Sequence, residues 1–337
     1  MSGDYEPWIP TGGKSNVAYR GNERGARAAL AKLLTETGSG KVSVQTIPHR
    51  RHAARRLARR IPFVPLQSAP HPLFVIAACA MICAVPEDYF GEDVAAGYDE
   101  SAGPEFNADV ISLTVDVLAE LAGDGSALEF AVGTGRIALP LASRGVPVSG
   151  IELSTAMAQR LRAKNSGLPV QVTIGDMATT RVHGNFRLVY LVYNTIGNLT
   201  TQDQQVACFA NAAAHLEPGG HFVIETGVPD LRRLPPGEDA RVFSHAPGRV
   251  GYDHYTDLVA QQAVSHHFVS GGVGAQEFTT PFRYVWPAEL DLMARLAGMK
   301  LLHRWGWWDR SPFTGESRTH VSVWQTPDSF EPRRDST

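Results

Sequence analysis

A glycine-rich turn flanked by two acidic residues is the part of the sequence best suited to bind a ligand. Residues Leu128–Arg136 have the pattern of a strand that enters a Gly133-x-Gly135 turn and opens a helix. Glycine lets a ligand approach the backbone closely, and the N–H groups at a helix start face that ligand. Glu152 follows Gly133 by 19 residues, at the expected end of the next strand. A carboxylate there can accept both hydroxyls of a ribose, so the spacing predicts a nucleoside-binding site.

Glu129 separates two interpretations of this turn. Gly133-x-Gly135-x-x-Ala138 with Glu152 fits a dinucleotide fingerprint, which makes an NAD-dependent oxidoreductase one alternative. Glu129, however, lies inside the first strand, where a dinucleotide-binding fold normally keeps an apolar residue. Its negative charge would repel a pyrophosphate and suit a cationic ligand that carries an amino group.

The same positions resemble motif I of the class I S-adenosylmethionine-dependent methyltransferases, which reads Asp/Glu-x-Gly-x-Gly-x-Gly. The sequence has Glu129, Ala131, Gly133 and Gly135 there, so alanine replaces the first glycine and can crowd the cofactor or tighten the turn. Further motifs follow in the family's order, namely the acidic residue that closes strand two, the Gly-Asp-Met segment at 175–177 and the Leu-Glu-Pro-Gly-Gly turn at 216–220. The resemblance spans about residues 88–325.

This resemblance implies an α/β fold, a doubly wound and mostly parallel seven-stranded sheet with an antiparallel last strand and a strand-rich insertion after strand 5. It implies methyl transfer from S-adenosyl-L-methionine to an oxygen or nitrogen atom of an unidentified small molecule, as in the bacterial small-molecule branch of the family. An inactive module that only binds the cofactor stays open as a further alternative. The residues expected to hold the cofactor are Tyr98, Glu129, Ala131, Gly133, Gly135, Arg136, Glu152, Leu153, Asp176, Met177, Tyr193 and Asn194.

The catalytic residue is not identified by any motif. Methyl transfer needs a general base only if the acceptor must lose a proton near the transition state. His254 and His267 are the leading candidates because they lie in the insertion expected to cover the acceptor, and Asn194 is a third candidate because it follows strand four. The segment after strand four is not the Asp/Asn/Ser-Pro-Pro-Tyr/Phe/Trp motif of adenine-N6 methyltransferases, and the sequence has no Pro-Cys pair for cytosine chemistry. Both absences disfavour a nucleic acid substrate.

Short apolar strands that alternate with helices are the elements that must position these residues. Such alternation favours a parallel sheet covered by helices on both faces. Strands are expected at 127–132, 146–151, 170–174, 186–192, 221–225, 300–307 and 320–325, and helices at 107–122, 136–144, 154–165, 201–216 and 287–298. Between 241 and 285 the pattern is extended and polar, which places the insertion at about 228–286.

Charge divides the chain into two unlike parts. Residues 1–80 contain 12 Lys and Arg against 4 Asp and Glu, whereas the remaining 257 residues contain 19 basic and 30 acidic residues. All methyltransferase motifs lie in the acidic part. We therefore expect a basic, partly disordered N-terminal extension at 1–80, a methyltransferase domain at 81–330 and a tail at 331–337, and a chain that begins at Met81 should still fold.

Composition limits the remaining function classes. The three cysteines are too few and too odd in number for a disulfide scaffold, and they point to a reducing cytoplasm without a metal site. The longest apolar run, Leu73–Val85, has 13 residues, which is too short to span a membrane. An isoelectric point near 6.5 gives no field for nucleic acid. We expect a small-molecule acceptor and no membrane, and the oligomeric state stays open.

Overall fold

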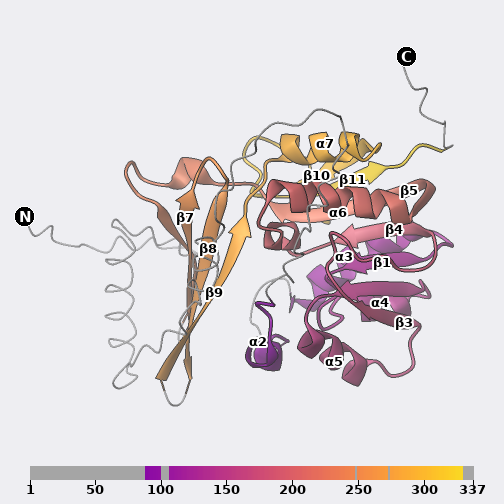
Figure 1. The fold of residues 1–337 in the computed structure, drawn as a ribbon, viewed down its shortest axis with the longest axis horizontal. Coiled ribbons are helices and arrows are strands. Elements are labelled where there is room, and N and C mark those ends of the chain that lie inside the picture. Colours follow the sequence, from indigo (N-terminus) through magenta and orange to yellow (C-terminus); the bar gives the residue numbers. More distant parts are fainter. Residues whose placement is uncertain (1–87, 100–105, 247–248, 272–273, 329–337) are drawn as a thin grey trace, which may run out of the picture.

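A seven-stranded sheet forms the centre of the protein (Figure 1). The computed structural model describes residues 88–99, 106–246, 249–271 and 274–328. The strand order is β10-β11-β5-β4-β1-β2-β3, and β11 alone runs antiparallel to its neighbours. The strands are β1 Ala127–Phe130, β2 Val148–Glu152, β3 Val170–Ile174, β4 Phe186–Leu191, β5 Leu216–Gly227, β10 Lys300–Trp305 and β11 Thr319–Gln325. This arrangement confirms the predicted fold class.

Helices cover both faces of this sheet and bury two apolar layers. Leu118 of α3 and Leu141 of α4 pack on one face, whereas Phe209 of α6 and Leu290 of α7 pack on the other. The helices are α2 Glu92–Gly97, α3 Ala108–Ala122, α4 Ala138–Ser143, α5 Thr155–Lys164, α6 Gln202–His215 and α7 Pro287–Leu296, and the 3-10 turns are η2 Thr195–Asn198 and η3 Leu231–Arg233.

The helix starts follow the capping residues in the sequence. The Ser154 hydroxyl accepts a hydrogen bond from Met157 N–H at the start of α5, where the sequence pattern predicts that a helix begins. Thr201 and Gln204 form a capping box at the start of α6. Side chains of this type satisfy N–H groups that have no partner within the helix, so they fix where the helix begins.

The insertion between β5 and α7 is a separate antiparallel sheet of four strands. Its strands are β6 Ala240–Ala246, β7 Arg249–Asp257, β8 Gln262–Gly271 and β9 Gly274–Arg283, and they pair in chain order. We call it the accessory sheet. It stands beside the seven-stranded sheet, and the end of β9 leads into α7 (Figure 1).

The expectations for the two termini fall outside the described residues. The basic extension at 1–80, the proposed start at Met81 and the tail at 331–337 all lie there. Within the described residues, no helix combines the length and the apolar character needed to cross a bilayer.

Candidate functional site

The glycine turn after β1 exposes its backbone on one side and packs tightly on the other. Ala131, Gly133 and Gly135 all have left-handed backbones, with φ angles of 51°, 57° and 82°. A Cβ atom at Gly133 would meet only the Ala131 carbonyl oxygen, at 4.0 Å. A Cβ atom at Gly135 would lie 2.9 Å from Leu161 Cγ of α5. Gly133 therefore leaves room for a ligand, whereas Gly135 lets the turn pack on α5.

Glu152 joins the end of β2 to this turn. Its carboxylate accepts a hydrogen bond from Gly133 N–H at 2.7 Å and another from Ser154 N–H at 2.8 Å. Burial raises the pKa of Glu152, and the two N–H groups oppose this rise. The carboxylate is thus held beside the open glycine, where each oxygen retains a second lone pair for a ligand hydroxyl.

Glu129 is a buried carboxylate one strand away. The residue is only 3% exposed, and its carboxylate accepts a hydrogen bond from the Tyr190 hydroxyl at 2.9 Å. Burial raises the pKa of Glu129 to about 8, although the Tyr190 hydroxyl and the Arg136 charge act against this rise. A cationic amino group near this carboxylate would restore its charge, so the site fits the aminoacyl end of S-adenosylmethionine.

Asp176 and Met177 follow β3 on the same edge of the sheet. The Asp176 carboxylate accepts a hydrogen bond from Ala178 N–H at 2.8 Å, which fixes the turn. The Met177 carbonyl accepts one from the Asn211 side chain of α6 at 2.8 Å. Leu153, the remaining expected residue of this edge, is half-buried between Glu152 and Ser154. The three strand ends thus bring the expected acidic residues to one edge.

The segment after β4 is strained and bound to β5. Tyr193 and Asn194 have consecutive left-handed backbones, with φ angles of 61° and 57°. The Asn194 side-chain oxygen accepts hydrogen bonds from the Thr226 hydroxyl and from Gly227 N–H. The Glu225 carboxylate accepts one from Tyr193 N–H at 2.9 Å. Non-glycine residues in this conformation cost about 1–3 kcal/mol each and cluster at functional sites.

An aromatic cluster lies beside this strained segment. Tyr98 makes edge contacts with Phe90 and Phe106, and Phe106 contacts Tyr193. The Arg136 guanidinium lies 5.4 Å from the Phe106 ring and 5.2 Å from the Tyr193 ring. The fold therefore joins the expected residues Tyr98, Arg136 and Tyr193, and Phe106 belongs to the same cluster although no sequence motif indicated it.

The segment that carries Tyr98 is attached to the glycine turn. The Asp99 carboxylate accepts hydrogen bonds from the Thr134 hydroxyl at 2.5 Å and from Lys164 at 2.7 Å. The Ser154 hydroxyl donates to the Phe90 carbonyl at 2.7 Å. Residues 88–99 thus belong to the edge of the sheet that carries the glycine turn, Glu152 and Asp176. We call it the cofactor edge, after the ligand expected there.

Comparisons with known proteins match this geometry. Residues 127–220 match the sequence profile described as a methyltransferase domain. The solved CcbJ methyltransferase from Streptomyces caelestis is 35% identical with a TM-score of 0.64, and the match covers 71% of this chain and 98% of that one. The chain belongs to the S-adenosylmethionine-dependent methyltransferases.

Two further comparisons are with a curated protein and with a solved structure. A curated cypemycin N-terminal methyltransferase from a Streptomyces species is 28% identical over 200 residues, which are 58% of this chain and 81% of that protein. The fold is also similar to that of CalS10, an amino pentose methyltransferase from Micromonospora echinaspora that was solved with S-adenosylmethionine bound. The TM-score is 0.51 and the identity 23%, and the match covers 68% of this chain and 94% of that one. Family membership decides against the NAD-dependent oxidoreductase.

The methyltransferase places its two candidate histidines on opposite faces of the accessory sheet. His254 Nε2 lies 3.4 Å from an Asp239 carboxylate oxygen. His267 stacks on Phe278 with 4.5 Å between ring centroids. Burial, followed by the charges of Arg249 and His266, lowers the pKa of His267 to about 4. His267 is therefore neutral at pH 7 and a weak base, and the two histidines do not form one site.

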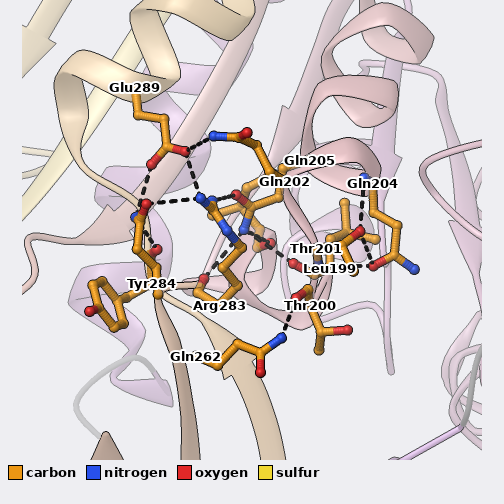
Figure 2. Close-up of polar contacts among 12 residues, drawn as sticks. Leu199, Thr200, Thr201, Gln202, Gln204, Gln205, Gln262, Arg283, Tyr284 and Glu289 are labelled. Atoms are coloured by element: carbon orange, nitrogen blue, oxygen red, sulfur yellow. Dashed lines mark hydrogen bonds and ion pairs between the residues drawn. The ribbon is translucent and has the colours of Figure 1, made fainter. Parts of the chain in front are cut away.

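A buried arginine anchors the accessory sheet of the methyltransferase to the rest of the domain (Figure 2). Arg283, at the end of β9, donates to Gln205 of α6 at 2.5 Å and to Glu289 of α7 at 2.6 Å. Gln205 donates in turn to the Ile196 and Leu199 carbonyls, in and just after η2. The accessory sheet is thereby linked to the strained segment after β4, a connection that no sequence motif indicated.

Proposed function

We propose that this methyltransferase methylates an amine nitrogen of a small molecule. Methyl transfer itself follows from the family, and the sequence left oxygen and nitrogen acceptors open. Two kinds of relative support nitrogen. One is the cypemycin N-terminal methyltransferase. The other is a dTDP-3-amino-3,6-dideoxy-alpha-D-glucopyranose N,N-dimethyltransferase from Streptomyces fradiae, 30% identical over 141 residues that make up 54% of that protein.

The observation that carries the cofactor assignment is the pair of buried carboxylates on adjacent strand ends beside an open glycine. We assign Glu152 to the ribose hydroxyls and Glu129 to the cationic amino group. We assign Asp176 and Met177 to the adenine ring, and the aromatic cluster around Tyr193 to the space next to the reacting carbon. Ala131, Gly133, Gly135 and Leu153 then form the wall of the site.

S-adenosylmethionine supplies an electrophilic methyl group when it is bound. The residues of this chain need to hold the acceptor nitrogen in line and to exclude water. In our assignment the aromatic cluster serves both tasks. Its rings come from residues 88–99, from Phe106 and from Tyr193 after β4, and their contacts with one another form an apolar surface beside the reacting carbon. An amine attacks only in its neutral form, so the site must also accept a proton.

The test uses acceptors in matched pairs. The full-length enzyme is incubated with S-adenosylmethionine and either a dTDP-amino sugar or its hydroxyl counterpart, and either a peptide with a free N-terminus or its acetylated form. Mass spectrometry should show added methyl groups on one of the two amines and on neither control. Methylation of the hydroxyl compounds alone would replace this proposal with oxygen methylation. Binding of S-adenosylhomocysteine without turnover of any acceptor would favour the inactive module.

The proposal also covers the cellular compartment and the domain boundaries. We place the enzyme in a reducing cytoplasm, which suits Cys208 as a free thiol buried in the core. We also keep residues 81–330 as the catalytic domain with an insertion at about 228–286, and a chain that begins at Met81 should bind S-adenosylhomocysteine.

A further inference from the structure

The accessory sheet presents two chemically different faces. Strand register places Arg241, Asp253, Ser265 and Thr280 in one row across the four strands. The neighbouring row on the same face contains Tyr255, Ala263 and Phe282. The opposite face contains Tyr252 stacked on His266, which is bound to Glu277 at 3.2 Å. Side chains alternate along a strand, so Asp253 and His254 point to different faces.

The face that carries Asp253 is turned toward the ends of β4 and β5. Phe282 packs against Gly197 of η2, since a Cβ atom added at Gly197 would lie 3.6 Å from the Phe282 Cβ atom. Arg241 Nη1 forms an ion pair with Asp230 at 2.8 Å, and Asp230 follows the end of β5. Tyr193 and Asn194 follow β4 and are hydrogen-bonded to the end of β5. This face of the accessory sheet therefore packs against the segments that follow β4 and β5, which we take as the acceptor side.

Asp253 has one oxygen engaged and no cation of its own. The Ser265 hydroxyl donates to its Oδ1 at 2.5 Å. Arg241, the nearest cation in the row, is paired with Asp230. Among the described residues, Asp253 forms no ion pair within 4 Å, and the residue as a whole is half-buried. The carboxylate can therefore take a cationic hydrogen-bond donor from a ligand.

The surroundings of Asp253 raise its pKa toward neutral pH. Burial raises the pKa of Asp253 to about 6, and the Ser265 hydroxyl, Arg241 and His266 limit this rise. At pH 7 the group is mostly ionised and can still take up a proton readily. The titratable and charged groups around it are Asp230 after β5, Arg241 on β6, Tyr255 on its own strand, and His266 and His267 on β8.

We propose that Asp253 binds the amino group of the acceptor and receives its proton, an inference that rests on the amine methylation proposed above. The ammonium N–H bond breaks, its electron pair stays on nitrogen, and the proton moves to the Asp253 carboxylate. The neutral nitrogen then forms a bond to the methyl carbon while the carbon–sulfur bond breaks and its electron pair stays on sulfur. Ser265 is a positioning residue that orients the carboxylate.

The experiment compares Asp253→Asn with Ser265→Ala and the wild type on the amine acceptor found above. Asparagine keeps an oxygen for the Ser265 hydroxyl, so the fold is preserved. We expect kcat/KM to fall about 100-fold in Asp253→Asn, the lower range for loss of a proton acceptor. The acidic limb of the pH profile, near pH 6 in the wild type, should disappear. In Ser265→Ala it should move to higher pH, because a hydrogen bond that stabilises the charge is lost.

Affinity for S-adenosylhomocysteine serves as the control and should not change in either variant. The inference is overturned if Asp253→Asn keeps kcat/KM within about twofold, or if activity and cofactor affinity fall together as in a general structural defect. An enzyme whose wild-type form methylates hydroxyls and not amines would instead disprove the proposed function, and this inference with it. Wild-type amine methylation combined with an unaltered Asp253→Asn variant overturns the Asp253 assignment alone.

Discussion

The edge of the seven-stranded sheet and the accessory sheet build their sites in different ways. At the first, consecutive strand ends present carboxylates and open backbone within a short stretch of chain, from Glu129 to Met177. At the second, a row across four strands unites Arg241, Asp253 and Ser265 only after the strands have paired. In our assignment, the first region binds the cofactor and the second binds the acceptor.

The largest effect is expected from Glu152→Ala. This carboxylate fixes the Gly133 backbone and, in our assignment, accepts the ribose hydroxyls. Loss of hydrogen bonds to a charged group costs about 1.5–3 kcal/mol each, so two of them correspond to about a 100-fold weaker binding or more. Calorimetric titration with S-adenosylhomocysteine measures this. Glu217→Ala, which removes an exposed carboxylate paired with Arg187, is the control and should bind normally. Equal affinity in both variants would remove Glu152 from the cofactor site.

Arg283→Met should damage the accessory sheet and leave the cofactor edge intact. Burial raises the pKa of Glu289, but hydrogen bonds from Gln261, Arg283 and Gln202 outweigh it and lower the pKa overall. Removing one member of a buried pair costs about 3–5 kcal/mol, whereas an exposed pair contributes about 0–1 kcal/mol. Arg310→Met, which breaks the exposed pair with Glu120, is therefore the matched control. Urea unfolding should separate the two variants, and similar midpoints would show that the network in Figure 2 has little energetic weight.

The third prediction concerns pH and Glu129. Its pKa is about 8 in the folded protein, whereas the ordinary value of a glutamate is 4.5, so between these pH values the folded protein retains a proton that the unfolded chain has lost. Stability should therefore fall as pH rises from 4.5 to 8, by on the order of 2 kcal/mol between pH 5 and pH 7. Glu129→Gln resembles the protonated form and should lose this dependence. Unfolding curves of both proteins at a series of pH values provide the measurement, and parallel pH profiles would contradict the assignment.

Glu129 also predicts a proton release when ligand binds. A cationic amino group lowers the pKa of a neighbouring carboxyl, so S-adenosylhomocysteine should expel the Glu129 proton at pH 7. Titrations in buffers of different ionisation enthalpy detect this release, and Glu129→Gln should abolish it.

The smallest effect is expected from Ala131→Gly. Ala131 has a left-handed backbone, which costs an alanine about 1–2 kcal/mol and which glycine adopts without that cost. Glycine also raises the conformational entropy of the unfolded chain, which cancels part of this stabilisation. We expect a net stabilisation of about 0.5 kcal/mol and an affinity for S-adenosylhomocysteine within a few-fold of the wild type. Thermal unfolding measures the first quantity. A clear loss of stability would mean that the alanine methyl group packs usefully in the turn.

The sequence was sufficient for the fold and for the strand ends that bring the expected cofactor residues to one edge of the sheet, because both depend on local patterns. The role of those residues in binding the cofactor stays a prediction. Ser154 and Thr201 cap helices where the pattern predicted, and Glu152 contacts the glycine turn that its spacing indicated. Phe106, Arg283 and Asp253 could not be found in this way. Their importance arises from strand register and from contacts between distant segments, as in Arg283 and Gln205, which are 78 residues apart. His254 and His267 were candidates because they lie in the insertion, but strand register, which the sequence does not show, places them on opposite faces.

The point at which the accessory sheet enters the chain has an evolutionary consequence. It leaves after β5 and returns at α7, and its contacts with η2, α6 and the segment after β5 are made through Phe282, Arg283 and Arg241. Mutations along its rows can accumulate without disturbing the glycine turn or the carboxylates beside it. In our proposal, the residues that select the acceptor and the residues that bind the cofactor therefore lie in separate parts of the chain, so substitutions in the accessory sheet can change the acceptor while cofactor binding is kept.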